Sequence, residues 1–128
     1  VTTQIAGLAS GSLFPVGTTT NTFRVTDAAG NTAECSFDVT ITDNEDPEIV
    51  CPGDIPQNVD AGADGAVVNY TTPVGTDNST GAVTTQIAGL ASGSLFPVGT
   101  TTNTFRVTDA AGNTAECSFD VTITDNED

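Results

Sequence analysis

An identical internal repeat constrains this chain more than any other feature. Residues 1–46 recur without a single change at residues 83–128, an offset of 82 residues. A fixed period of this kind indicates a tandem array of similar folding units. We therefore expect one complete unit at residues 47–128, preceded at residues 1–46 by the C-terminal part of an earlier unit. The first residues, VTTQIAG, look like a strand from the middle of a unit, so we expect the chain to begin inside a longer protein.

The charge balance argues against several classes of partner. The 128 residues include 17 Asp and Glu but only two basic residues, Arg24 and Arg106, which gives a net charge of −15 at pH 7. Such a chain repels the phosphate backbone of nucleic acids and anionic membrane surfaces. No apolar run approaches the roughly 20 residues that a membrane-spanning helix needs. We therefore expect neither nucleic-acid binding nor membrane insertion in this segment.

Short apolar and β-branched runs, bounded by Gly, Pro and Asp, predict an all-β fold. The clearest run alternates strictly, with Cys117, Phe119 and Val121 on one parity and polar residues on the other. This alternation is typical of a strand with one buried and one solvated face. The complete unit contains seven such runs, at 48–51, 55–59, 66–72, 82–88, 94–98, 101–108 and 115–124. About seven short strands in one repeat predict a small β-sandwich.

Five segments of the complete unit resemble the hyalin (HYR) repeat. They are IVCP at 49–52, GAVV at 65–68, TDN at 76–78, GSLFPVGTT at 93–101 and TDAAGNTAECSF at 108–119. The resemblance covers the whole unit and implies an immunoglobulin-like β-sandwich of about this size. It also implies tandem arrays in extracellular and cell-surface proteins, including large bacterial adhesins, and no enzymatic activity.

The repeat makes two of the three cysteines, Cys35 and Cys117, equivalent residues of successive units. In a sandwich of the family it resembles, the first and last strands can lie side by side, so we expect a disulfide between Cys51 and Cys117. Cys35 would then pair with a residue in the preceding part of its own repeat, outside this chain. The alternative is a pair of free buried thiols, and zinc binding is disfavoured because His and Cys-x-x-Cys spacing are absent. A disulfide indicates an oxidising, extracytoplasmic location.

Acidic residues gather at the expected junction between units. The linker at 42–48 is acidic and contains no Gly, unlike a flexible hinge. In an immunoglobulin-like sandwich, the chain enters at the end that carries the second-to-third-strand loop and the last hairpin turn. Calcium prefers oxygen ligands from carboxylates, amide side chains and backbone carbonyls. We therefore predict a calcium site with six candidate ligands: Asp43, Glu45, Asp46, Asp77, Asn78 and Asp109. The alternative is that the acidic groups solvate the linker and that the Asp and Asn residues form turns.

The residue types that catalysis needs are scarce. No Lys or His can act as a base near neutral pH, so Ser and Cys nucleophiles have no activating partner of either type. Paired carboxylates can hydrolyse glycosides, but here they fall in turns and a linker with few aromatic residues for sugar stacking. We therefore expect no enzymatic activity.

These observations predict a structural segment of an extracellular stalk or filament, from a bacterial surface protein, with calcium stiffening as one feature. Its partners would be neighbouring repeats of the same chain, and identical chains could also associate laterally through exposed strand edges. The alternative is a module that binds a protein or a glycan and gains avidity from many copies. A binding module needs an exposed apolar patch on its loops. The loops of this chain are rich in Gly, Ala, Thr, Asn and Asp, which favours the structural interpretation.

Overall fold

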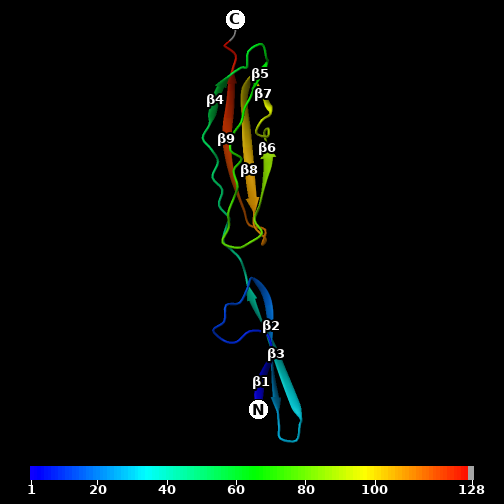
Figure 1. Ribbon diagram of the computed structural model, residues 1–128. Helices are drawn as coiled ribbons and strands as arrows, with labels where there is room; N and C mark the ends of the chain where they lie inside the picture. The colour runs from blue at the N-terminus through cyan, green and yellow to red at the C-terminus, as the bar shows by residue number, and fades with distance from the viewer. Residues whose placement is uncertain (127–128) are drawn as a thin grey trace. The chain divides into compact units, whose positions relative to one another are not determined.

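The computed structural model describes residues 1–126, and these form only strands, turns and loops. The prediction of an all-β fold is therefore confirmed. The chain divides into two compact units, Val1–Asp43 and Asn44–Asp128 (Figure 1). Within residues 1–126 there is no helix of the length and apolarity required to cross a bilayer.

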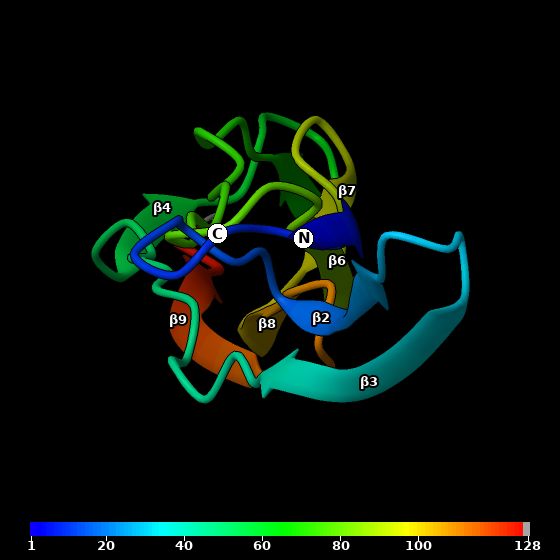
Figure 2. The ribbon, with the colours of Figure 1, turned by 90° about the horizontal axis from the view of Figure 1, so that it is seen from below.

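The second unit is an immunoglobulin-like sandwich. Its strands are β4 (Ile55–Asn58), β5 (Gly65–Val67), β6 (Val83–Ala88), β7 (Leu95–Pro97), β8 (Gly99–Thr108) and β9 (Thr114–Thr124). Four of them form one sheet in the order β4-β9-β8-β6, and β5 pairs with β7 in a second sheet. The members of the larger sheet follow one another around an arc in the end-on view (Figure 2). The first strand, β4, pairs in parallel with the last, β9, so the first and last strands of the unit lie side by side.

The two-residue alternation predicted for the last strand decides which side chains form the core. Phe119, Val121 and Ile123 of β9 are all at most 2% exposed. They pack with residues of β5, β7, β8 and the segment after β5; the buried cluster comprises Ala66, Val68, Phe96, Phe105, Phe119, Val121 and Ile123. The opposite face of the β8–β9 hairpin is solvated, and there Thr102 donates a hydrogen bond of 2.8 Å to Asp120. One parity therefore supplies the core and the other supplies exposed cross-strand pairs.

A disulfide joins Cys51 to Cys117, whose Cα atoms are 5.7 Å apart. Both residues are half-buried against the core cluster. The bond ties the segment before β4 to the last strand, as the family resemblance implied. Cys35, the repeat equivalent of Cys117, is exposed and forms no disulfide within the described residues, so its expected bond to a residue outside this chain stays a prediction.

One of the expected strands is absent, and another is shorter than the sequence indicated. The run at 48–51 is wrong as a strand, because only Glu48 pairs, in an isolated bridge with Thr76. Pro47 and Pro52 flank this run and have no N–H to donate to a ladder. The run at 66–72 ends as a strand at Val67, because a side chain takes over: the N–H of Tyr70 donates to Ser92 Oγ at 2.8 Å. Six strands instead of about seven are therefore present in the described part of this unit.

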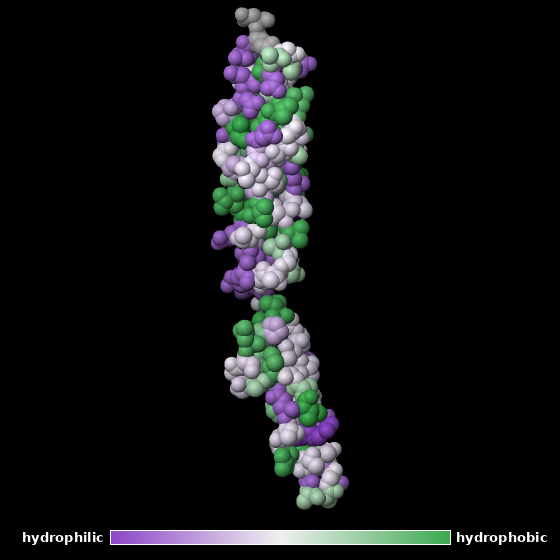
Figure 3. All heavy atoms as spheres, in the orientation of Figure 1, coloured by the Kyte–Doolittle hydropathy of each residue, from purple (hydrophilic) through white to green (hydrophobic). Residues whose placement is uncertain are grey.

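The first unit is a three-stranded sheet of β1 (Thr2–Ala6), β2 (Gly17–Thr26) and β3 (Thr32–Ile41), in that order. It repeats the register of β6, β8 and β9, so that Phe23 lies opposite Cys35 as Phe105 lies opposite Cys117. Its apolar face is nevertheless open, and hydrophobic residues are visible on the surface of this unit in Figure 3. The same sequence therefore forms the same sheet in both units, and only the second unit includes, within the described residues, the segment that covers it.

Candidate metal centre

The last hairpin turn holds one carboxylate in a buried and fully hydrogen-bonded position. Asp109 directly follows β8 and is 4% exposed. Its Oδ1 accepts the backbone N–H of Ala111 at 3.0 Å and of Asn113 at 2.8 Å, and its Oδ2 accepts the Asn113 side-chain amide at 3.0 Å. Gly112 completes the turn at a φ of 92°, a left-handed conformation that favours glycine. The predicted turn chemistry is therefore present, and the carboxylate is also fixed in place.

Asp109 is charged at neutral pH in spite of its burial. Desolvation by burial raises the pKa of this carboxyl, but the hydrogen bonds from Asn113, Ala111 and Gly112 together outweigh it and lower the pKa below its ordinary value. A hydrogen-bond donor that faces the ionised form favours that form. The turn therefore presents a permanent negative charge near neutral pH.

A second carboxylate, Asp77, lies in the loop before β6. The backbone of Thr76 anchors this loop through two hydrogen bonds of 2.8 Å with Glu48. Asp77 Oδ2 accepts the N–H of Ser79 at 3.3 Å, whereas its Oδ1 is buried and has no hydrogen-bond partner among the described residues. A buried carboxylate oxygen without a partner is costly and calls for an explanation.

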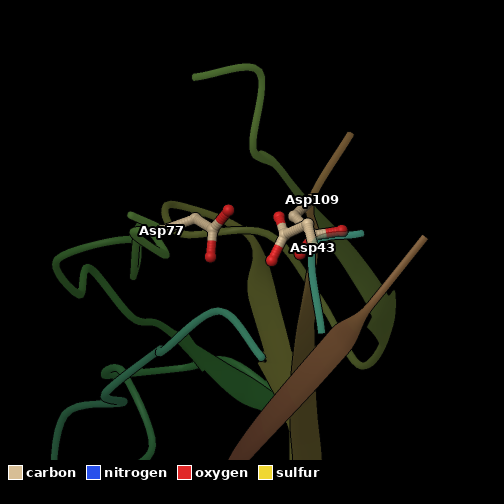
Figure 4. Close-up of side chains that lie close together, drawn as sticks. All are labelled: Asp43, Asp77 and Asp109. Carbon is tan, nitrogen blue, oxygen red and sulfur yellow. The ribbon is translucent and has the colours of Figure 1, made fainter. Parts of the chain in front are cut away.

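The carboxylates of Asp77 and Asp109 converge at one end of the second unit. An oxygen of one lies within 4.8 Å of an oxygen of the other (Figure 4). They come from two loops that are far apart in the sequence and that the sandwich brings together. Like charges at this separation repel each other unless a proton or a cation compensates them.

The acidic linker runs past the same end of this unit. The side-chain amide of Asn113 donates to the backbone carbonyl of Glu45 at 3.2 Å, which attaches the linker to the hairpin turn. A hollow of about 180 Å³ is present there; it is lined by Glu45, Asp46, Glu48, Thr76, Asp77 and Asn78. Five of the six predicted ligands therefore lie at this end of the unit. The sixth, Asp43, also drawn in Figure 4, is the last residue of the first unit and directly precedes Asn44.

Two residues that shape this end were missed by the sequence reasoning. Glu48 lines the hollow but had been assigned to a strand. Asn113, treated only as a turn residue, also holds Glu45. The acidic run at 43–48 contained a signal for Glu48, but no local pattern indicated the link between Asn113 and Glu45.

Comparison with known protein families agrees with the observed fold. The HYR domain model matches residues 2–41 and again residues 42–123. The chain belongs to the HYR domain family. The family model matches the chain twice, and the second match begins at residue 42, in the acidic linker.

The HYR relatives include hyalin from two species. The chain is 43% identical to hyalin of Strongylocentrotus purpuratus over 119 residues, which is 90% of this chain and 10% of that protein. It is 38% identical to hyalin of Lytechinus variegatus over 125 residues, which is 94% of this chain and 23% of that protein.

A third HYR relative is the Sushi, von Willebrand factor type A, EGF and pentraxin domain-containing protein 1 of Rattus norvegicus. It is 35% identical over 86 residues, which is 66% of this chain and 2% of that protein. The chain therefore spans a small part of each curated relative it matches. These relatives are extracellular or surface proteins of animals, and the expected bacterial origin finds no support among them.

Proposed function

We propose that this chain is part of a non-catalytic array of HYR repeats in an extracellular stalk or filament, in which calcium stiffens the junction between repeats. The observation that carries the proposal is the buried, unpartnered Oδ1 of Asp77 beside the charged Asp109, at the end where the acidic linker enters. The proposal needs no bacterial origin.

The donor set supports calcium as the cation. Calcium takes six to eight oxygen ligands from carboxylates, amide side chains, backbone carbonyls and water. Asp77 and Asp109 supply two carboxylates that would otherwise repel each other. Glu45, Asp46 and Asn78 border the same hollow, and all offer oxygen. We include Asp43 because it adjoins Asn44 in the chain and falls within the second HYR match.

Calcium would act by joining the linker, the Asp77 loop and the hairpin turn. The side-chain amide of Asn113 already attaches the hairpin turn to the linker at Glu45. A cation shared by the linker, the Asp77 loop and the hairpin turn would restrict the backbone dihedrals of residues 43–48. Because the second copy of the repeat ends in the same four residues, Asp-Asn-Glu-Asp, every junction of such an array would carry the same ligands.

The proposal assigns no catalytic activity because of the residue types that the chain contains. The chain has no His and no Lys, so it has no group that titrates near neutrality to serve as a general base. The converging carboxylates occupy a turn and a loop where hydrogen bonds already engage Asp109 on both oxygens. This arrangement suits a fixed ligand better than a proton carrier.

Calorimetric titration of calcium into the full chain tests the proposal. We expect saturable binding to one site, lost in Asp77→Asn and in Asp109→Asn. Asp27→Asn is the matched control, because Asp27 is the repeat equivalent of Asp109 and has the same bonds to Ala29 and Asn31 in its turn. Binding should survive in this control. No heat with the unaltered chain would reject the calcium site and leave the array proposal standing on the repeat alone.

A binding module remains the second candidate because of two exposed valines. Val50 is 85% exposed and Val74 is 76% exposed, and they flank the bridge between Glu48 and Thr76. Exposed apolar side chains of this kind can contact a protein partner. Two valines form a small patch, however, and no aromatic residue lies at 48–50 or 74–76. The structural array is therefore the better supported function.

A further inference from the structure

The outer face of the β5–β7 sheet carries an exposed apolar pair. Val67 lies directly opposite Leu95 in the register of these strands, so the two side chains are neighbours on one face. Val67 is 47% exposed and Leu95 is 57% exposed, whereas Ala66 and Phe96, on the inner face, are fully buried. Neither member of the pair belongs to the buried cluster, and their apolar surface faces solvent.

An exposed asparagine follows this pair on the same face. From Ala66 to Tyr70 the side chains alternate between covered and exposed positions, and Asn69 is exposed like Val67. Tyr70 points inward, with its ring edge-on to Phe119 at a centroid distance of 5.0 Å. Side chains two residues apart in an extended segment lie about 7 Å apart on one face. Asn69 is therefore the polar neighbour of the exposed pair.

The backbone around Asn69 is fixed, and there is space beside its side chain. The preceding residue, Val68, donates its N–H to the carbonyl of Ser94 at 3.3 Å and accepts the N–H of Gly93 at 2.7 Å. Gly93 has no side chain, and a Cβ placed there would lie 3.5 Å from Asn69 Oδ1. A bulky group on the Asn69 amide therefore has room without any movement of the backbone.

Asn69-Tyr70-Thr71 is an acceptor sequence for N-linked glycosylation, which requires Asn-x-Ser/Thr with x other than Pro. Such a short pattern carries little weight by itself, but the fold adds to it. Both Asn69 and Thr71 are exposed. The disulfide between Cys51 and Cys117 indicates passage through an oxidising compartment, which is where such glycans are transferred.

We propose that Asn69 carries an N-linked glycan whose first sugar covers Val67 and Leu95. A pyranose ring has a face of C–H groups, and an N-acetyl group adds a methyl, so the first sugar can bury apolar surface of the pair. Attachment at Asn69 places this sugar beside Val67. The inference rests on the extracellular part of the proposed function, since the glycan is added during secretion, and it does not depend on calcium.

The glycan would come from a polyprenyl diphosphate oligosaccharide, in a transfer catalysed by a membrane-bound transferase of the secretory pathway. Asn69 Nδ2 forms a bond to the anomeric carbon of the first sugar, and the bond between that carbon and the diphosphate oxygen breaks. The polyprenyl diphosphate leaves, and one amide proton passes to a base of the transferase. No oxidant or reductant takes part. The Thr71 hydroxyl is the second group of the acceptor sequence that the transferase recognises.

Secretion of the full chain from cultured animal cells, behind a secretory leader, tests the modification. Peptide N-glycosidase in heavy-oxygen water converts each glycosylated Asn to a labelled Asp, which peptide mapping by mass spectrometry locates. We expect the label at Asn69. Thr71→Val should abolish it, whereas Thr72→Val, a change at the next exposed threonine, should retain it. No label at Asn69, or label confined to the other acceptor sequence at Asn78, would overturn the proposal.

Thermal unfolding of the secreted chain, before and after glycan removal, tests the cover. Removal should lower the unfolding temperature of the second unit by about 4 °C, a shift typical of one modest contact in a domain of this length. The loss should be smaller in Val67→Thr. Val83→Thr is the matched control, because Val83 is an exposed valine of β6, in the other sheet, and it should show the full loss.

The new Asp charge that enzymatic removal leaves at position 69 is common to all three chains, so it cancels in the comparison. An equal loss in Val67→Thr and in the unaltered chain would overturn the cover of the apolar pair. Neither experiment involves calcium binding by Asp77 and Asp109, so this proposal and the calcium proposal fail separately.

Discussion

Single residues with two simultaneous roles shape the candidate site. Asp109 closes a hairpin turn through Asn113 and Ala111, and it also points a carboxylate oxygen to within 4.8 Å of one from Asp77. The sequence predicts the calcium ligand and the turn as alternatives for Asp109; the turn is present, and the ligand role stays a prediction. It could not show the unpartnered oxygen of Asp77, because that depends on how closely two loops approach in the folded chain.

The hydrogen bonds of Asp109 predict how stability depends on pH. The folded state lowers the pKa of Asp109 below its value in the unfolded chain, near 3.8. Ionisation of this carboxyl therefore stabilises the fold at pH values above 3.8. This contribution is lost as the pH falls through the pKa of the folded state. Asp109→Asn should therefore lower the unfolding temperature at pH 7 in calcium-free buffer, by an amount that shrinks below about pH 4. Thermal unfolding followed by circular dichroism measures this. A difference in unfolding temperature that stays constant from pH 7 to pH 2 would contradict the lowered pKa of Asp109.

At the scale of strands, local patterning predicted the long hairpin well and the short elements poorly. The alternation at 115–124 matches the buried parity of β9, because every second residue of a strand faces the core. The prediction of a strand at 48–51 is wrong, since only Glu48 pairs, in a bridge with Thr76, and the flanking prolines have no N–H to donate. The open face of the first unit was beyond any local pattern, since Phe37 and Phe119 have identical neighbours and opposite burial. Burial there depends on whether a second segment is present.

The disulfide should dominate the stability of the second unit. It closes a loop of 66 residues, and a loop of that length restricts the unfolded chain by about 4 kcal/mol. Replacing both Cys51 and Cys117 by Ala should lower the free energy of unfolding of this unit by about that amount. Urea unfolding, with Cys35→Ala as the control that removes only the free thiol, measures the difference. A loss under about 1 kcal/mol would mean that the core alone sets the stability.

At the scale of the whole chain, the repeat makes the linker the part that decides how an array behaves. Both copies of the hairpin end in the same acidic sequence, and the second family match begins there. Under the calcium proposal, the linker is ordered by the cation in addition to its bond with Asn113. Calcium should then slow amide hydrogen exchange at residues 43–48.

The turn at 27–31 provides an internal control for that measurement. It repeats the hydrogen bonds of the 109–113 turn but belongs to the first unit, so its exchange should be insensitive to calcium. Hydrogen–deuterium exchange read by mass spectrometry resolves both segments. Unchanged exchange at 43–48 in saturating calcium, or an equal change in Asp77→Asn, would refute the stiffening of the junction.

The parallel pairing of β4 with β9 determines how the second unit would respond to tension along the chain. The entering and leaving segments of parallel strands point to opposite ends, so a pull on the termini slides the strands past each other and loads their hydrogen bonds together. The Cys51–Cys117 bond lies on that same path. Once the strands slip, force passes through the sulfur bridge, and the chain between the two cysteines cannot be drawn out. Under oxidising conditions, such a unit would lengthen only by the few residues outside the disulfide loop at each end. It would then stop extending.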